Sequence, residues 1–517
     1  MDIEHAFEQD FVTLAELIGA HAVRQPRHAA LVQGERSLDY AALEALMDRV
    51  AASLQRDGVR PREVIAICAA TTIEYGALFL GALRAGVAVA PLAPSATAES
   101  LADMVTDCGA RLLFLDRAAA KTLQPVSARI SATRVGLEAG DFESWVAPAG
   151  AQPAPVAVEP DWPFNIIYSS GTTGEPKGIV QSHLMRWGHV RRGKAYGYGP
   201  EAVTLISTPL YSNTTLVSFF PTLALGGTVV LMAKFDVAGY LALAEKHRVT
   251  HTMLVPVQYQ RIMAYPDFGK FDLSSFRMKF STSAPFPAAL KADVLKRWPG
   301  GLTEVYGMTE GGGTCILQAH LHPDKLHTVG RPVEGHDIRL IDEQGREVAR
   351  GEAGEVVGHS KMMMNGYHNQ PHKTAEAEWR DASGKRFVRT GDVGRFDEQG
   401  FLTLLDRKKD MIISGGFNIY PSDLEAILRE HPAVAEAAVI GVPSERWGET
   451  PVAFAVLKSG VHASAPELLA WANARLGKTQ RLADLRVTPE LPRSPIGKVL
   501  KRELRDAYRA QTARSDY

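Results

Sequence analysis

The feature that most constrains the fold is a repeated alternation of amphipathic helix patterns with short apolar strand patterns. An amphipathic stretch at 40–54 precedes the strand-like VIAIC at 64–68, and a helical run at 74–85 precedes the apolar VAVAPL at 87–92. The alternation returns at 228–232, 237–246 and 250–256. Alternation of this kind predicts parallel sheets covered by helices.

The pattern changes after about residue 330. Short alternating strand patterns with turn signals fill residues 338–405, which predicts a small β-rich subdomain. Beyond residue 407 a helix pattern at 421–430 and a strand pattern at 434–442 indicate a separate compact α/β unit. The predicted class is therefore α/β, with a large N-terminal domain of several subdomains and a small α/β C-terminal domain.

Composition and charge exclude several classes of protein. The chain has 517 residues, 45% hydrophobic and 22% charged, which is typical of a globular protein with more than one domain. Its formal net charge of -1 favours neither nucleic acid nor an anionic membrane as a partner. The acidic N-terminus lacks a signal-peptide pattern, and Glu74 and Arg84 interrupt the most apolar stretch. We therefore expect a cytoplasmic protein without a transmembrane segment.

The cysteines give no sign of a metal site. Cys68, Cys108 and Cys315 lie far apart in the sequence and have no metal-type spacing. We expect reduced thiols rather than structural disulfides.

The run YSSGTTGEPKG, residues 168–178, is the strongest local signal for ligand binding. It follows an apolar strand pattern, and the glycines Gly171, Gly174 and Gly178 permit a tight turn or a close approach to a ligand. Its hydroxyl groups and the charge of Lys177 suit phosphate oxygens. Because Gly, Ser and Thr are also the usual loop residues, composition alone leaves a plain surface loop open.

Two familiar nucleotide motifs do not fit this run. A Walker-type loop requires Gly-Lys followed by Ser or Thr, whereas Pro176 precedes Lys177 and Gly178 follows it. No G-x-G-x-x-G fingerprint follows a strand pattern either. The sequence therefore disfavours the hypotheses of a generic P-loop kinase and of a dinucleotide-dependent dehydrogenase.

Five segments, in one order along the chain, resemble the signature segments of the adenylate-forming superfamily. They are YSSGTTGEPKG at 168–178, YGMTE at 306–310, TGDVG at 390–394, DRKKDMIISGGFNIYP at 406–421 and PRSPIGK at 492–498. This family includes acyl-CoA synthetases, aryl-CoA ligases, luciferases and adenylation domains. The resemblance implies an AMP-binding domain, residues 1–408, and a mobile C-terminal domain, residues 409–517, that alternates between two arrangements.

The resemblance also implies a reaction in two steps. A carboxylate attacks the α-phosphate of ATP, and a thiol then attacks the acyl-adenylate. Tyr306 would pack against adenine, Glu310 would hold Mg²⁺ and Asp392 would accept hydrogen bonds from the ribose hydroxyls. The implied nucleotide contacts are Ser169, Ser170, Gly171, Thr172, Thr173, Gly174, Lys177, Ser283, Ala284, Pro285, Tyr306, Gly307, Thr309, Asp392 and Arg407. The implied catalytic residues are Lys498, Glu310 and Thr173.

The resemblance implies that the C-terminal segments take part in the change between the two domain arrangements. Lys409 aligns with the hinge of the family, and Lys498 would reach the carboxylate and the α-phosphate during adenylation. Ser414, Gly415 and Gly416 would then line the tunnel for the pantetheine arm of CoA. Pro495 and Ile496 replace the hydroxyl residues that the family often has before this lysine. In some relatives the lysine is acetylated, so a lysine acetyltransferase is an expected partner.

The acyl pocket is the least specified part of the site. Tyr211, Ser212, Thr215 and Gly312 are expected to border it, and the glycine run at 311–313 is expected to leave room for a chain or ring. Ser212 stands where many acyl-CoA synthetases have a histidine. The acid could be aliphatic, dicarboxylic or aromatic. No acidic residue lies between 209 and 227, which disfavours an amino acid as the substrate.

The sequence thus predicts an ATP-dependent acid–CoA ligase that forms AMP, with ATP, Mg²⁺ and coenzyme A as its small-molecule partners. The alternatives are a CoA ligase for benzoate- or cinnamate-type aromatic acids and an adenylating enzyme with a carrier protein as acceptor. Since no carrier domain follows Lys498, free CoA is the favoured acceptor. A silent binding or scaffold protein is disfavoured because Lys498, Glu310 and Asp392 are all present. A homodimer is one expected assembly.

Overall fold

The computed structural model describes residues 3–169, 177–407, 410–414, 417–444, 447–477, 480–494 and 497–515. The chain divides into two compact units. Unit 1 contains Met1–Leu326, Pro332–Asp337 and Gly358–Val388. Unit 2 contains His327–Arg331, Ile338–Val357 and Arg389–Tyr517.

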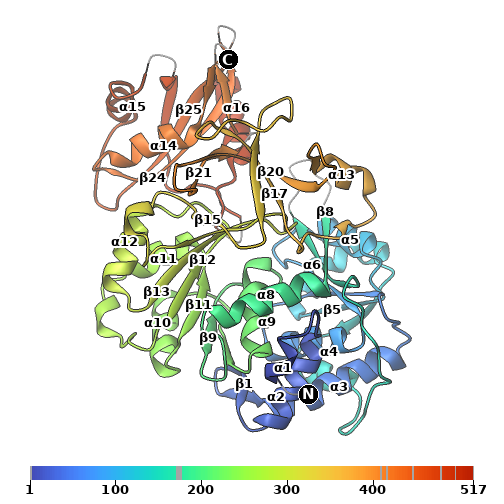
Figure 1. Cartoon of the computed structure of the whole chain (residues 1–517). Helices are drawn as coiled ribbons and strands as arrows, with labels where there is room; N and C mark the ends of the chain where they lie inside the picture. The colour runs from blue at the N-terminus through green and yellow to red at the C-terminus, as the bar shows by residue number, and fades with distance from the viewer. Residues whose placement is uncertain are drawn as a thin grey trace. The chain divides into compact units, whose positions relative to one another are not determined.

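A seven-stranded sheet in unit 1 includes the strand that leads into the predicted phosphate loop (Figure 1). Its order is β18-β8-β7-β4-β3-β5-β6; the strands from β7 to β6 run parallel, and β8 pairs antiparallel with both β7 and β18. β3 is buried at every residue, as expected where both faces of a parallel sheet are covered. The strands are β3 (Val64–Cys68), β4 (Ala88–Pro91), β5 (Leu112–Leu115), β6 (Thr133–Gly136), β7 (Pro163–Ser169), β8 (Lys177–Ser182) and β18 (Gly366–Tyr367).

A nine-stranded sheet has the order β15-β14-β13-β12-β11-β9-β10-β1-β2. Its six central strands, from β13 to β1, run parallel, and β14 and β2 are antiparallel to their inner neighbours. The strands are β1 (Ala29–Gln33), β2 (Arg36–Asp39), β9 (Val203–Ile206), β10 (Thr228–Leu231), β11 (His251–Leu254), β12 (Met278–Ser281), β13 (Gly301–Tyr306), β14 (Cys315–Gln318) and β15 (Arg331–Pro332).

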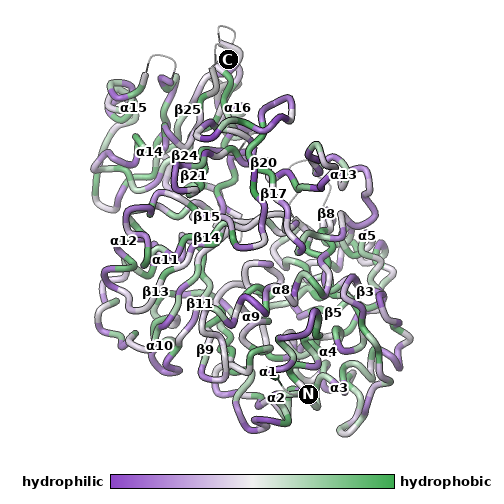
Figure 2. The backbone as a smooth tube through the Cα atoms, in the orientation of Figure 1, coloured by the Kyte–Doolittle hydropathy of each residue, from purple (hydrophilic) through white to green (hydrophobic). Residues whose placement is uncertain are grey.

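Helix α4 (Ile73–Arg84) connects the cores of the two sheets. Residues 73–83 are all buried, and the helix contacts β4 of one sheet and β1 of the other. A helix that is apolar all round belongs inside a large protein. Gly81 allows α3 (Tyr40–Arg56) to pack closely, because a Cβ there would lie 2.5 Å from Val50 Cβ. Hydrophobic residues follow the sheet strands and α4 in Figure 2.

Unit 1 contains further helices and three 3-10 turns among its described residues. Side-chain caps define several N-termini: Asp236, for example, accepts a hydrogen bond from the Gly239 amide at the start of α10. The helices are α1 (Ile3–Ala6), α2 (Leu14–Arg24), α5 (Ala98–Asp107), α6 (Arg117–Leu123), α7 (Ala139–Trp145), α8 (His183–Ala195), α9 (Asn213–Ala224), α10 (Val237–Lys246), α11 (Pro256–Met263), α12 (Ala288–Arg297) and α13 (Pro371–Glu376), with 3-10 turns η1 (Gln124–Arg129), η2 (Phe268–Lys270) and η3 (Pro323–Lys325).

The predicted β-rich segment forms a five-stranded sheet, β16-β17-β20-β19 with β21 paired to β20. The C-terminal part forms another, β23-β22-β25-β24, in which β26 runs parallel to β25. These strands are β16 (Asp337–Ile341), β17 (Gly354–His359), β19 (Glu378–Arg380), β20 (Arg386–Phe396), β21 (Leu402–Arg407), β22 (Ile412–Ser414), β23 (Phe417–Ile419), β24 (Val434–Ser444), β25 (Gly448–Leu457) and β26 (Asp484–Val487). The helices are α14 (Pro421–Glu430), α15 (Ala465–Asn473) and α16 (Lys501–Ser515).

The predicted α/β class and most of the predicted elements are confirmed. The helices expected at 237–246 and 421–430 are α10 and α14 with the same bounds. The strand expected at 250–256 is shorter, because Pro256 occupies the first position of α11, where proline suits a helix start. Among the described residues no helix is long and apolar enough to span a membrane. The three cysteines are buried.

Candidate active site

Three of the predicted site segments follow parallel strands of the nine-stranded sheet. Residues 207–215 follow β9, residues 282–285 follow β12 and residues 307–310 follow β13. Because these strands run parallel, their carboxyl ends meet at the same edge of the sheet. Ligands of open α/β sheets bind outside this edge. The fold therefore gathers the predicted acyl-pocket, adenine and metal-binding segments from distant parts of the sequence.

A contact between two hydroxyl groups joins the first two segments. Thr214 Oγ1, in the first turn of α9, lies 2.5 Å from Ser283 Oγ. Ser283 has a φ of 78°, a left-handed conformation that non-glycine residues seldom adopt, so the surrounding structure must hold it there. The side chains of Ala284 and Pro285 next to it are half-buried and exposed, respectively. The predicted adenine loop thus contacts α9, the helix at the predicted acyl pocket.

The predicted phosphate loop joins the ends of β7 and β8. These strands pair so that Ser169 lies opposite Lys177, the first residue of β8. Tyr168, one residue earlier, donates a hydrogen bond to Asp107 Oδ2 at 2.5 Å, which fastens the end of β7 to α5. The loop residues Ser170, Gly171, Thr172, Thr173 and Gly174 and the side chain of Ser169 lie outside what the structure describes.

Tyr367 is a site residue that the sequence analysis missed. Its hydroxyl donates a hydrogen bond to Glu310 Oε1 at 2.9 Å. Burial, with a smaller effect of the Glu310 charge, raises the pKa of this hydroxyl. The ring centroid lies 5.3 Å from Lys177 Nζ, within the range of a cation–π contact. Tyr367 therefore contacts both the predicted phosphate-binding lysine and the predicted metal-binding carboxylate.

Pairing between strands places Tyr367 there. β18 pairs with β8, with Tyr367 opposite Ile179. Just before β18, the Met364 amide donates a hydrogen bond to the Glu310 carbonyl oxygen at 2.8 Å. Residues 364–367 are thus held by the phosphate-loop strand on one side and by the Glu310 segment on the other. No local pattern in the sequence signals this, because the contacts join segments far apart in the chain.

Replacing Tyr367 with phenylalanine is expected to raise the KM for MgATP about 3- to 10-fold and to change kcat less than about twofold, because one hydrogen bond to a charged group is lost while the ring remains. Steady-state kinetics with ATP as the varied substrate measures this. Tyr265→Phe is the control, since the Tyr265 hydroxyl makes no hydrogen bond within the described residues. An unchanged KM for MgATP in Tyr367→Phe would contradict the role.

Backbone packing accounts for two glycines of the run at 311–313. Gly311 and Gly312 have φ values of 77° and 81°. A Cβ on Gly311 would lie 2.2 Å from the Met362 carbonyl oxygen, and one on Gly312 would lie 2.9 Å from the Gly358 carbonyl oxygen. Glycine is thus required by conformation and by close approach of the backbone. Gly312 as a border of the acyl pocket, and the room that the run leaves for a chain or ring, stay predictions.

The other predicted acyl-pocket residues lie at different depths around the start of α9. Tyr211 is half-buried, and burial raises the pKa of its hydroxyl. Ser212 is buried. Thr215 is fully buried, and its hydroxyl donates to the Pro209 carbonyl oxygen at 2.6 Å. Thr215 therefore shapes this segment from inside, and Tyr211 offers more surface to a ligand.

The adenine and metal segment lies directly after β13. Tyr306 ends the strand and is half-buried, Gly307 is exposed, and Thr309 and Glu310 are half-buried. The Thr309 carbonyl oxygen accepts a hydrogen bond from Gln181 Nε2 of β8 at 2.7 Å. The segment is thus held by the same strand that begins with Lys177.

In unit 2, Asp392 and Arg407 lie opposite each other in the antiparallel pair of β20 and β21. Ser414 ends β22 and is buried. The structure does not describe Lys409, Gly415, Gly416 or the side chain of Arg407.

Lys498 follows a tight turn in unit 2. Gly497 has a φ of 79°, and its amide donates to the Ser494 carbonyl oxygen at 2.8 Å. The Ser494 and Lys498 backbones also bond, because the Ser494 amide donates to the Lys498 carbonyl oxygen at 2.8 Å. Arg493 Nη1 donates to the Gly497 carbonyl oxygen at 2.7 Å. The glycine before the lysine is therefore needed by the turn.

Known proteins resemble the chain along nearly its whole length. The AMP-binding enzyme family matches residues 19–368, and the AMP-binding enzyme C-terminal domain matches residues 423–498. Feruloyl-CoA synthase from Amycolatopsis sp. is 35% identical over 95% of this chain and 99% of its own. Indoleacetate–CoA ligase from Aromatoleum aromaticum is 33% identical over 96% and 99%. The crystal structure of ATP-bound MatB from Rhodopseudomonas palustris has a TM-score of 0.87 at 28% identity, over 96% and 99%.

Proposed function

The chain belongs to the AMP-binding enzyme family, and from this premise we propose that it is an AMP-forming acid–CoA ligase, which joins a carboxylic acid to coenzyme A through an acyl-adenylate. The observation that carries the proposal is that Tyr367 contacts both Lys177 and Glu310, the residues that we propose bind phosphate and metal. Acid–CoA ligases among the full-length relatives support it.

The first step requires positive charge and alignment more than it requires a base, since carboxylate and triphosphate are both anions. Lys177 is proposed to bind the pyrophosphate end of ATP, and Lys498 to stabilise the charge at the carboxylate and the α-phosphate. Tyr306 is proposed to pack against adenine and Asp392 to accept hydrogen bonds from the ribose.

Glu310 suits a magnesium ion by its chemistry. Its carboxylate offers the oxygen ligands that Mg²⁺ prefers, and Tyr367 orients one of its oxygens. One protein carboxylate is enough, because Mg²⁺ on a nucleotide takes most of its ligands from phosphate and water. When bound, the ion would neutralise phosphate charge. A requirement for Mg²⁺ is part of the proposal.

The second step is proposed to use the C-terminal residues 409–517. Lys409 would act as the hinge, and Ser414, Gly415 and Gly416 would line the passage for the pantetheine arm of CoA. The turn at Gly497 would carry Lys498 into the adenylating arrangement and away from it. We propose the boundary between the two domains at residues 408 and 409.

Within this function we propose an aromatic acid as the substrate class. Two full-length relatives are named for aromatic acids, the feruloyl and indoleacetate enzymes. Ser212, in place of a histidine, presents a small side chain at the start of the pocket helix, which suits a wider acyl group. Fatty and dicarboxylic acids are the competing classes.

The decisive experiment is a screen for AMP release with the full-length enzyme, ATP, Mg²⁺ and CoA across aromatic, aliphatic and dicarboxylic acids. We expect an aromatic acid to give AMP and acyl-CoA in equal amounts, and to give pyrophosphate exchange when CoA is left out. Exchange without CoA-dependent AMP release would favour a carrier protein as acceptor. Absence of exchange with every acid would refute the function.

Several finer expectations belong to this proposal as well. These are cytoplasmic location, a homodimer and acetylation of Lys498 by a lysine acetyltransferase. Acetylation would remove the positive charge on which the first step depends. Mass mapping of protein from acetylating cells, with Lys498 always unmodified, would count against it.

A further inference from the structure

Arg186 of α8 is a buried cation that the proposed chemistry does not use. It is 1% exposed, and its guanidinium lies over the rings of Phe164 and Phe220, at 5.6 Å and 5.7 Å from their centroids. Burial lowers the pKa of Arg186 to about 9, so it keeps its charge at neutral pH. A buried charge destabilises a fold unless polar groups compensate it. The hydrogen-bond partners of Arg186 therefore indicate which segments this charge holds together.

The partners are side-chain amides rather than carboxylates. Arg186 Nε and Nη2 donate to Asn165 Oδ1 at 3.1 Å and 2.9 Å, and Nη2 also donates to Gln181 Oε1 and, at 2.9 Å, to Asn213 Oδ1. Asn165 and Gln181 are themselves fully buried and share a hydrogen bond of 3.0 Å. In the described part of the chain, Nη1 has no hydrogen-bond partner.

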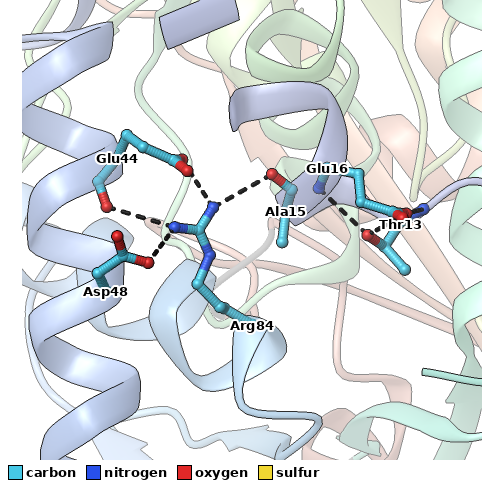
Figure 3. Close-up of polar contacts among 6 residues, drawn as sticks. All are labelled: Thr13, Ala15, Glu16, Glu44, Asp48 and Arg84. Atoms are coloured by element: carbon cyan, nitrogen blue, oxygen red, sulfur yellow. Dashed lines mark hydrogen bonds and ion pairs between the residues drawn. The ribbon is translucent and has the colours of Figure 1, made fainter. Parts of the chain in front are cut away.

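A second arginine of unit 1, whose side chain is 13% exposed, shows the usual arrangement. Arg84 of α4 bonds the carboxylates of Glu44, at 2.6 Å, and Asp48, at 2.5 Å, and the Ala15 carbonyl oxygen, at 3.2 Å (Figure 3). Burial acts to lower the pKa of Arg84, but its two carboxylate partners raise it overall. Arg84 is therefore neutralised by a local ion pair, whereas the charge of Arg186 is shared among neutral amides from three elements.

These three elements carry the predicted site. Asn165 lies in β7 and Gln181 in β8, the strands on either side of the phosphate loop. Gln181 also donates to the Thr309 carbonyl oxygen, next to Glu310. Asn213 is the first residue of α9, directly after Tyr211 and Ser212. Arg186 thus joins the nucleotide-binding strands to the helix of the acyl pocket.

We propose that Arg186 is a positioning residue that couples the acid-binding segment to the nucleotide-binding strands, so that carboxylate and α-phosphate are held in reactive alignment. The proposal rests on the proposed ligase function. Two hydrogens of Nη2 serve three amide oxygens, so loss of one acceptor lets the guanidinium turn towards the others. Removing the Asn213 acceptor therefore alters the hydrogen bond between Arg186 and Gln181.

The test is a double-mutant cycle on the full-length enzyme, with pyrophosphate exchange as the readout. Asn213→Ala is expected to raise the KM for the acid about 5-fold through the lost hydrogen bond from Arg186. Gln181→Met is expected to raise the KM for MgATP at least about 5-fold, because Gln181 loses its hydrogen bonds with Arg186, Asn165 and Thr309. In the double variant, the loss in kcat/KM is expected to differ from the product of the single losses by at least about 3-fold, which is the mark of coupled sites. If the loss in kcat/KM of the double variant equals the product of the losses in the two single variants, the proposal is overturned.

Arg186→Met extends the cycle. In that background, Asn213→Ala is expected to change either KM less than about twofold, because its hydrogen-bond partner is gone, while Gln181→Met keeps the effect of its lost bonds to Asn165 and Thr309. An effect of Asn213→Ala as large as in the parent enzyme would overturn the proposal. If Arg186→Met does not fold, the cycle with Arg186 present still decides, because Asn213 is only half-buried and its alanine variant leaves the core intact.

Arg84→Met is the matched control. It also removes a partly buried, ion-paired guanidinium from unit 1, so it is expected to lower Tm while both KM values change less than about twofold. A shift in the two KM values as large as that of the Asn213 and Gln181 variants would show that lost stability alone explains them, and would overturn the proposal. Absence of exchange in the parent enzyme with every acid would refute the ligase function instead, so the two failures are distinguishable.

Discussion

Lys498→Ala is expected to lower the rate of acyl-adenylate formation about 100- to 1000-fold, the range for removal of one group that stabilises transition-state charge. Thioester formation from supplied acyl-adenylate is expected to change less than about threefold, because that step is proposed to use the other domain arrangement. Pyrophosphate exchange measures the first step, and CoA consumption with synthetic acyl-adenylate measures the second.

Arg502→Ala provides the control for this variant. Arg502 is a nearby cation whose side chain is 71% exposed and lies 3.8 Å from Asp506, so its removal should leave both steps unchanged. An equal loss in both steps for Lys498→Ala would contradict the assignment of Lys498 to adenylation alone. No loss in either step would remove Lys498 from the catalytic residues.

Glu310→Ala is expected to lower acyl-adenylate formation about 100-fold at low Mg²⁺, because the ion loses its protein ligand while the negative charge of ATP remains. The Mg²⁺ concentration for half-maximal rate should rise about 10-fold, and excess Mg²⁺ should restore part of the rate. Pyrophosphate exchange over a Mg²⁺ titration at fixed ATP gives both quantities.

The matched control for Glu310 is Glu334→Ala, which removes an exposed carboxylate of the same unit. It should follow the Mg²⁺ dependence of the parent enzyme. Loss of rate by the same factor at every Mg²⁺ concentration in Glu310→Ala would show that Glu310 acts on ATP or on the fold rather than through the ion. Combined with Tyr367→Phe, the variant should show little further loss, because the hydroxyl acts through the Glu310 carboxylate.

Much of the fold is predictable from local pattern. The periodicities at 237–246 and 421–430 give two helices with their observed bounds, since a capping aspartate marks the start of the first and a proline marks the start of the second. The strand at 250–256 was predicted too long, because apolar residues continue from β11 into α11 without a break in hydrophobicity. The parallel sheets follow from the alternation, but their strand orders do not, since pairing depends on contacts between distant segments.

The candidate site, like the fold, is predictable from the sequence only in part. The order of the segments identified the residues of the phosphate loop, Tyr306, Glu310, Asp392 and Lys498 as candidates. Asn165 and Gln181 were passed over, although each is a polar residue within an apolar strand pattern and so carries a weak signal. Tyr367 and Arg186 carry no such signal, because an aromatic next to a glycine and an arginine in a helix are ordinary on a protein surface.

By itself the sequence determined the α/β class, the order of the signature segments and the chemistry that they imply, because periodicity and residue type are properties of the chain read locally. Only the tertiary structure decided that Tyr367 holds Glu310 and that Arg186 joins β7, β8 and α9. The physical reason is that the role of a polar side chain depends on its burial and on which acceptors are within reach. Both are set by the packing of elements that the sequence places far apart.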